Sequence, residues 1–101
     1  MVSRIKTLSG SEINPFCFGT LQWGGKANGA AAQSLYQMCR DTGINYLHTA
    51  YAYCEGTSEK FLSAFCEKDR HALLIATKVG HAGGAAKTNI VEQFDQCQTR
   101  L

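Results

Sequence analysis

The sequence predicts an α/β fold built from three successive strand–loop–helix units. Short apolar runs begin at Phe16, Ile44 and Leu73, so a new strand starts every 28 or 29 residues. A stretch with helical periodicity follows each run, which is the pattern of parallel strands joined by crossover helices. Eight units of this length would make about 230 residues, close to the size of a typical (βα)8 barrel.

The period alone does not choose between α/β architectures. A flavodoxin-like or Rossmann sheet has a similar repeat. No Gly-x-Gly-x-x-Gly follows the first apolar run, and this weakens the Rossmann alternative. The 101 residues hold three units, so they form one small domain or part of a larger one.

Composition excludes several classes of protein. Hydrophobic residues make up 45% of the chain, enough for a packed core, so a disordered chain is not expected. The ten Lys and Arg and eight Asp and Glu are dispersed, which argues against a nucleic-acid surface. No run approaches the roughly 18 apolar residues of a membrane helix. Five cysteines without a Cys-x-x-Cys pair predict no metal site and indicate reduced thiols in a cytoplasmic protein.

The amino-terminal elements are predicted to be a hairpin and a core strand. Residues 4–8 alternate polar and apolar side chains, Ser9 and Gly10 favour a turn, and residues 11–13 can return as a second short strand. The apolar run at residues 16–20 follows Pro15 and predicts the first core strand. We therefore expect a small β-hairpin in front of the repeating units.

The first helix is predicted over residues 30–40. One helical face is formed by Ala31, Leu35, Met38 and Cys39. Gly43 is well suited to end this helix, because glycine adopts the left-handed conformation needed there. The apolar residues 44–47 then predict the second strand.

The remaining elements follow the same order. The second helix has an apolar face and a possible cap at Thr57 or Ser58, and that face consists of Phe61, Leu62, Phe65 and Cys66. The third strand, residues 73–77, is a continuous apolar run of the kind buried on both faces. Asn89 and Glu92 have capping-box spacing and would open the last helix. Its expected buried residues are Ile90, Phe94, Cys97 and Leu101.

Loops after parallel strands converge on one end of the sheet. Here they carry a group of polar and aromatic side chains: Trp23, His48, Tyr51, Tyr53, Lys78 and His81. A tyrosine in such a pocket can protonate a carbonyl oxygen while hydride arrives at carbon. A cation must stabilise the phenolate, because free tyrosine has a pKa of about 10. Lys78, directly after the third strand, is well placed for this role.

Several motifs resemble one enzyme family. Residues 43–59 resemble the aldo-keto reductase signature Gly-x-Asn-x-x-Asp-Thr-Ala-x-x-Tyr followed by Gly-x-Ser-Glu. Residues 18–24, 77–80 and 94–101 resemble the family's first strand and loop, its strand-three lysine motif and its Asp-x-Ser-Leu-x-Arg-Leu helix. The resemblance implies that residues 1–101 form part of such a domain, the first three βα units of a TIM-type (βα)8 barrel preceded by a β-hairpin.

The same resemblance implies a function: the NADPH-dependent reduction of aldehydes or ketones to alcohols. Tyr53 matches the proton-donating tyrosine and Lys78 its lysine partner. His48 stands where the family has a catalytic Asp. The expected cofactor contacts are Thr20 and Leu21, and the expected substrate-pocket residues are Trp23 and Tyr51.

Two features lead us to expect impaired or absent catalysis by this short chain. A neutral imidazole at His48 supplies no negative charge to Lys78. The family's fourth strand, which brings a catalytic His, and its later cofactor loops have no counterpart in these residues. The alternatives are a non-catalytic interaction or assembly module, self-associating through exposed sheet edges, and a gene remnant.

Overall fold

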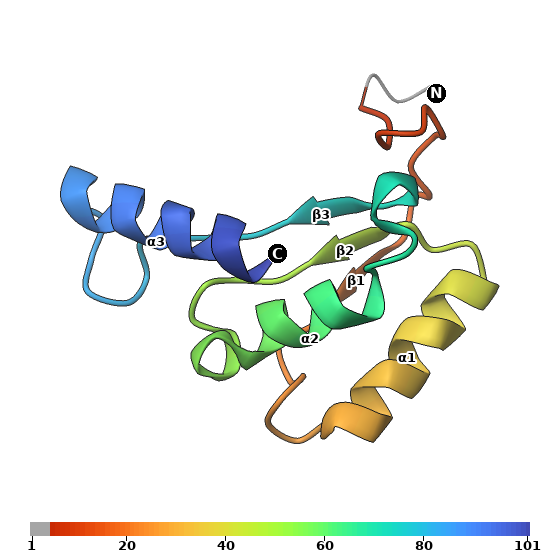
Figure 1. Ribbon diagram of the computed structural model, residues 1–101, viewed down its shortest axis with the longest axis horizontal. Helices are drawn as coiled ribbons and strands as arrows, with labels where there is room; N and C mark the ends of the chain where they lie inside the picture. Colours follow the sequence, from red (N-terminus) through yellow and green to blue (C-terminus); the bar gives the residue numbers. More distant parts are fainter. Residues whose placement is uncertain (1–4) are drawn as a thin grey trace.

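The computed structural model describes residues 5–101 and confirms an α/β architecture (Figure 1). Its single sheet has three parallel strands in the order β1-β2-β3. The strands are β1 (Cys17–Gly19), β2 (Tyr46–His48) and β3 (Leu74–Ala76), each shorter than the predicted run. The α-helices are α1 (Gly29–Asp41), α2 (Thr57–Phe65) and α3 (Lys87–Arg100), and the 3-10 turns are η1 (Tyr53–Gly56) and η2 (Arg70–Ala72).

The strand register divides the sheet into two faces. Phe18, Leu47 and Ile75 are paired across the three strands and pack into or against the helix-covered core. Successive side chains of a strand point to opposite faces. The neighbouring row of Gly19, His48 and Ala76 therefore lies on the other face, which corresponds to the interior of a barrel.

The core lies between the sheet, α1 and α2. Its largest fully buried side chains include Trp23, Leu47, Leu62 and Leu73, each at most 1% exposed. Each such aliphatic side chain contributes about 1.5–3 kcal/mol through the hydrophobic effect. The predicted apolar face of α2 is confirmed, because the core cluster contains Leu62 and Cys66 with Phe61 and Phe65 packed against it.

The predicted face of α1 is wrong in two positions. Ala31 is exposed and Met38 is 61% exposed. Ala32 and Tyr36 face the core instead, together with the correctly predicted Cys39. Tyr36 can be buried because its hydroxyl donates a 2.7 Å hydrogen bond to Asp69, which satisfies the polar end of an otherwise apolar side chain.

The start of α2 also differs from the prediction. Gly56 occupies the N-cap position and neither Thr57 nor Ser58 caps the helix through its side chain. The Ser58 hydroxyl is used elsewhere, in a buried hydrogen-bond network described below. At 93° the φ of Gly56 is left-handed, a conformation that glycine adopts without steric cost.

The third unit is less buried than predicted. All β3 residues are only partly buried, and on α3 Ile90 is 37% and Phe94 51% exposed. The reason is that nothing else among residues 5–101 covers the outer edge of β3 or that side of α3. Cys97 is buried as predicted, whereas Gln93 is an unpredicted buried residue.

The predicted capping box at Asn89 is wrong. The N-cap of α3 is Ala86, three residues before Asn89, and the helix begins at Lys87. The Asn89 amide instead donates to the carbonyls of Ala82 and Gly84, and so supports the preceding loop.

The predicted hairpin is reduced to one antiparallel bridge between Lys6 and Glu12. The Thr7 amide donates to the Ser11 carbonyl at 3.0 Å and closes the turn. Arg4, where the first hairpin strand was predicted to begin, lies outside the described residues.

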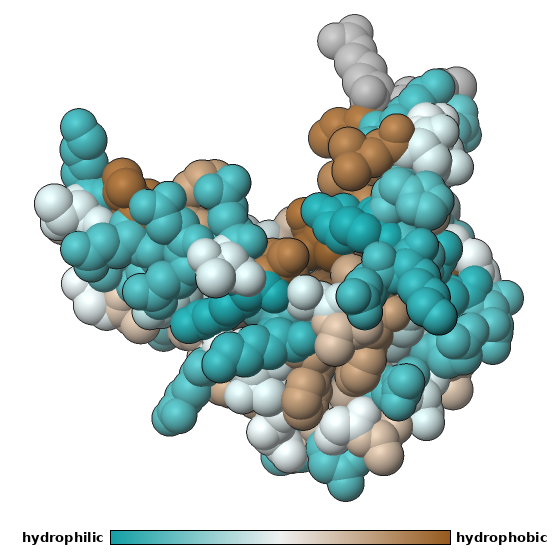
Figure 2. Space-filling view, in the orientation of Figure 1, coloured by the Kyte–Doolittle hydropathy of each residue, from teal (hydrophilic) through white to brown (hydrophobic). Residues whose placement is uncertain are grey.

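The visible surface mixes polar and apolar areas (Figure 2). Figure 2 shows apolar surface at the amino-terminal segment, where Ile5 is 60% and Leu8 80% exposed. Within the part of the chain that the structure describes, no helix is both long and apolar enough to span a membrane.

Candidate active site

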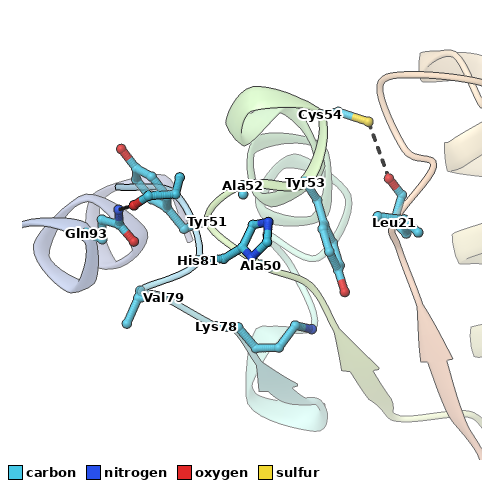
Figure 3. Close-up of a pocket in the computed structure, with 11 residues that line it drawn as sticks. Leu21, Ala50, Tyr51, Ala52, Tyr53, Cys54, Lys78, Val79, His81 and Gln93 are labelled. Atoms are coloured by element: carbon cyan, nitrogen blue, oxygen red, sulfur yellow. Dashed lines mark hydrogen bonds between the residues drawn. The ribbon is translucent and has the colours of Figure 1, made fainter. Parts of the chain in front are cut away.

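The loops after β1, β2 and β3 meet around one cavity of about 580 Å³ (Figure 3). Parallel strands place these loops at the same end of the sheet. The cavity is lined by Leu21, Ala50, Tyr51, Ala52, Tyr53, Cys54, Lys78, Val79, His81, Ala82 and Gln93. Four of the predicted site residues line this cavity: Leu21, Tyr51, Tyr53 and Lys78. His48 is not part of the wall but contacts Lys78.

Lys78 is the centre of the site. Its ammonium nitrogen lies 4.6 Å from the centroid of the Tyr53 ring, within the range of a cation–π contact. The same nitrogen donates to the Thr49 carbonyl at 2.9 Å and lies 3.4 Å from Nδ1 of His48. These three partners fix the ammonium beside the tyrosine, so the structure brings the predicted Tyr53, Lys78 and His48 together.

The contact with Lys78 determines the role of His48. An ammonium has three donors and no acceptor, so Nδ1 of His48 must accept. The imidazole is therefore neutral, with its proton on Nε2, when this contact forms. On the other side, a methyl group added to Gly19 would lie 2.9 Å from Nε2 of His48. The absence of a side chain at Gly19 makes room for the imidazole ring.

Thr20 is turned away from the cavity. It is fully buried, and its hydroxyl lies 2.6 Å from the Ser58 hydroxyl and donates to the His48 carbonyl at 3.2 Å. Ser58 in turn donates to the Thr20 carbonyl and contacts the Thr49 hydroxyl, each at 2.9 Å. This network joins the ends of β1 and β2 to α2. The side chain of Thr20 is thus a structural link, whereas Leu21, 53% exposed, lines the cavity.

Trp23 lies in the core and not in the wall of the cavity. It is 1% exposed, and its ring centroid is 6.0 Å from that of Phe18 and 5.7 Å from that of Phe65. The prediction that Trp23 lines the substrate pocket does not match this position. The indole is held inside because the loop after β1 folds back over α2, where a methyl group on Gly24 would lie 2.5 Å from Thr57.

Tyr51 does line the cavity, and a partly buried ion pair holds it there. The Arg100 guanidinium lies 4.5 Å from the Tyr51 ring centroid and donates to the Tyr51 carbonyl at 2.9 Å. It also forms a 2.9 Å salt bridge with Glu59, whose side chain is fully buried. The second carboxylate oxygen of Glu59 accepts from Thr77 at 2.7 Å. The pair therefore joins α2, α3, the tyrosine loop and Thr77, the residue directly after β3.

The two partners of this ion pair lie in motifs that are visible in the sequence. Both Glu59 and Arg100 belong to the motifs that resemble the aldo-keto reductases. Gly56 belongs to the same motif, and a methyl group there would lie 2.6 Å from Cζ of Arg100. The glycine is needed both for its left-handed backbone and for this close approach.

The loop after β3 is fixed by a buried glutamine. Gln93 is 4% exposed, accepts from the Gly80 amide at 2.8 Å and donates to the Ala82 carbonyl at 2.7 Å. His81 lies between these two anchored residues and projects into the cavity (Figure 3). A glutamine in a helical stretch carries no sequence signal for such a role, so Gln93 was missed.

The segment after Tyr53 has an unusual backbone. Cys54 and Glu55 have φ values of 48° and 55°, in the left-handed region that side chains with a Cβ avoid. Each such residue costs about 1–2 kcal/mol. The Cys54 thiol lies against the Leu21 carbonyl at 3.4 Å, a contact that helps to hold this turn closed.

All five cysteines are free thiols, and three of them are buried. Burial raises the pKa values of the Cys39 and Cys66 thiols above the ordinary value of a cysteine. Burial and the neighbouring Glu59 together raise the pKa of Cys97 to about 11. These three thiols stay protonated at neutral pH. No group of three potential metal ligands occurs among residues 5–101.

Comparison with known proteins agrees with this arrangement. The model of the aldo/keto reductase family matches residues 15–101. A probable voltage-gated potassium channel subunit beta of Arabidopsis thaliana is 28% identical over 103 residues, covering 92% of this chain and 31% of the relative.

Two solved structures show the same fold. An aldo-keto reductase of Bacillus halodurans in its holo form has a TM-score of 0.78 and 23% identity, over all of this chain and 37% of that one. An aldo-keto reductase of Klebsiella pneumoniae in complex with NADPH has a TM-score of 0.68 and 20% identity, over 97% of this chain and 36% of that one. The chain spans about a third of the length of these relatives. The family match over most of its residues shows that the chain belongs to the aldo/keto reductase family.

Proposed function

We propose that this chain carries the tyrosine–lysine part of a carbonyl reductase site that uses NADPH. The observation that supports this most directly is the Lys78 ammonium held 4.6 Å from the Tyr53 ring centroid at the wall of the cavity. The substrate class is an aldehyde or ketone that becomes an alcohol. The five free thiols support a reducing, cytoplasmic setting for this reaction.

Only one end of a nicotinamide dinucleotide finds suitable partners in these residues. The cavity has an apolar wall at Leu21 and a cation at Lys78, which suits a flat nicotinamide ring beside a carbonyl substrate. The Thr20 side chain is occupied by its contacts with Ser58 and His48, so Leu21 and the backbone beside it remain as cofactor contacts. A reduced nicotinamide, when bound, supplies the hydride.

The chain's own residues supply the proton. The Tyr53 hydroxyl would hold the carbonyl oxygen and donate its proton to it. The Lys78 ammonium beside the ring would stabilise the charge that develops on the phenolic oxygen. General acid catalysis of this kind contributes typically 10² to 10⁴ in rate. His48 would position Lys78 through a hydrogen bond but, being neutral, would not add the charge of a carboxylate, so we propose an impaired reductase.

The test is a fluorescence titration of NADPH into the chain, followed by NADPH oxidation with benzaldehyde. We expect saturable binding, and slow oxidation that falls at least 100-fold in Tyr53→Phe while NADPH affinity is unchanged. The matched control is Tyr46→Phe, on β2 and outside the cavity. Oxidation that survives in Tyr53→Phe would show that Tyr53 is not the proton donor, and the absence of NADPH binding would refute the reductase proposal.

A second candidate function, an assembly module that associates with itself, is favoured by the third unit. Within the described residues β1 and β3 each have one paired neighbour, and α3 exposes Ile90, Val91 and Phe94. Open strand edges and exposed apolar side chains promote association. The Arabidopsis relative is itself described as a channel subunit. Concentration-dependent oligomers that Phe94→Glu dissociates would support this role, and a monomer at all concentrations would exclude it.

A further inference from the structure

The open edge of β3 lies at the base of a hollow in the surface. Figure 1 shows β3 as the uppermost strand, with α3 on one side and the amino-terminal segment on the other. The Ser9 amide donates to the His71 carbonyl at 2.9 Å and holds this segment beside the start of β3. Figure 2 shows the hollow between the two. Both sides of it carry apolar side chains, since Leu8 is 80% and Phe94 51% exposed.

The backbone of β3 is paired on one side only. The Leu74 amide and the Ala76 carbonyl each form a 2.8 Å hydrogen bond with a residue that flanks β2. Backbone groups of a strand alternate in direction, so the N–H and C=O of Ile75 point out of the opposite edge. Within residues 5–101 no strand pairs with this side of β3. The Leu73 carbonyl already accepts from the Arg70 guanidinium at 3.2 Å, so Ile75 is the centre of the open edge.

A groove of about 270 Å³ runs between this edge and α3, and its lining residues are Arg70, Thr77, Phe94, Cys97, Gln98 and Leu101. Ile75 belongs to the row of side chains on the helix-covered face of the sheet, with Phe18 and Leu47. A strand added to the edge would place a side chain beside Ile75 on the same face. That side chain would extend the row and fill the groove against Phe94.

The exposed surface of the chain exceeds that of a compact monomer by about one interface. The chain exposes 6445 Å², whereas a compact protein of 11.0 kDa exposes about 5,600 Å². Its radius of gyration is 13.8 Å, against about 12.7 Å for a compact domain of this length. The excess surface of about 800 Å² equals the area that each partner contributes to a standard protein–protein interface.

A second copy of the chain fits this edge, because a two-fold axis makes the edge complementary to itself. With the axis at Ile75, the two β3 strands run antiparallel, and each Ile75 donates a hydrogen bond to the other and accepts one from it. The axis also exchanges the two sides of the hollow, so that Phe94 of one copy meets Leu8 of the other. We propose that two copies associate through their β3 edges in this orientation and form one continuous sheet.

This inference rests on the second candidate function, self-association, and specifies its surface and orientation. It does not depend on the reductase proposal. A chain that stays monomeric at all concentrations would refute both self-association and the β3 interface. Oligomers in which the Ile75 amide stays open to solvent would refute the β3 interface alone.

The experiment is backbone amide hydrogen exchange, measured by NMR at low and at high protein concentration. Sedimentation velocity gives the oligomeric state at each concentration. We expect a dimer at high concentration, in which the Ile75 amide exchanges at least tenfold more slowly than in the monomer. The Leu74 amide, which is already hydrogen-bonded inside the monomer, should change much less.

The variant Ile75→Pro tests the hydrogen bonds between the copies. Proline removes an N–H that the monomer does not use for pairing, and an edge strand tolerates this change. We expect its dimer to be at least tenfold weaker than that of Ile75→Ala, which also shortens the side chain but keeps the N–H. Circular dichroism shows whether both variants are folded.

The variant Leu8→Glu tests the apolar contact and changes no strand of the monomer. It should weaken the dimer at least tenfold, because a charge would be buried against Phe94 of the other copy. The matched control is Met38→Glu, at a 61% exposed position on α1, which should dimerise normally.

Three results would overturn the proposal. The first is equal dimer affinity for Ile75→Pro and Ile75→Ala. The second is an Ile75 amide whose exchange rate does not depend on protein concentration. The third is equal weakening by Leu8→Glu and Met38→Glu, which would show that the association is not specific to this surface.

Discussion

The two halves of the molecule are held together by different forces. Around β1, β2, α1 and α2, the side chains of Trp23, Leu47 and Leu62 form a continuous apolar core. The third unit lacks such a core, because Phe94 and its neighbours on α3 are exposed. There the packing depends on buried polar links, above all the ion pair of Glu59 with Arg100. The active-site cavity lies where these two regions meet.

This comparison explains how a half-covered sheet positions a site. Apolar burial requires surfaces on both sides of a side chain, and the third unit has only one such surface. A hydrogen-bonded ion pair can fix two helices and a loop through a single point of contact. Its net contribution to stability is modest, because both ions lose hydration when they are buried. It is therefore better suited to define a geometry than to stabilise the whole domain.

The largest effect is expected for a change in the apolar region. Leu62→Ala should lower the free energy of unfolding by about 3 kcal/mol, since it removes a fully buried side chain and leaves a cavity. Urea unfolding measures this change. The matched control is Met38→Ala, 61% exposed on α1, which should change stability by about 0.5 kcal/mol or less. Equal effects of the two substitutions would contradict the division into two regions.

An intermediate and local effect is expected in the polar region. Glu59→Gln should cost about 2 kcal/mol, because Arg100 loses its charged partner inside the protein. The loss should appear as faster amide hydrogen exchange in α3 while the amides of α1 remain protected. Glu92→Gln, an exposed residue of the same helix, serves as the control. Uniform loss of protection in both helices would show that the ion pair supports the whole domain.

The smallest effect concerns pH and Cys97. Burial, reinforced by Glu59, raises the pKa of this thiol from 9.0 to about 11. An acid whose pKa is raised by folding contributes stability below its unfolded pKa, and this stability is lost as the pH rises towards the folded pKa. We expect this group to contribute a loss of about 1 kcal/mol in the free energy of unfolding between pH 9 and pH 10.

The variant Cys97→Ser isolates this contribution. Serine does not titrate in the range and keeps a hydroxyl that can contact Glu59, so its stability should decline less steeply above pH 9 than that of the unchanged chain. Thermal unfolding at pH 8, 9 and 10 gives the comparison. Parallel pH profiles for the two chains would exclude Cys97 as a source of alkaline instability.

Local sequence patterns were sufficient for the order and type of the elements. Strands begin close to the predicted positions, because short apolar runs such as residues 44–47 and 73–77 favour buried strands. The pairing of Tyr53 with Lys78 was also predicted, from motifs at the ends of two strands. These are features that depend on neighbouring residues and on the convergence of parallel strands.

What the sequence alone determined is therefore the α/β order, the family and the meeting of Lys78 with Tyr53. Only the tertiary structure decided that Trp23 is a core residue, that Phe94 is exposed and that Glu59 pairs with Arg100. The physical reason is that burial and pairing depend on which surfaces of distant segments come together. Periodicity shows that a helix has an apolar face, but the elements packed against that face decide whether it is covered.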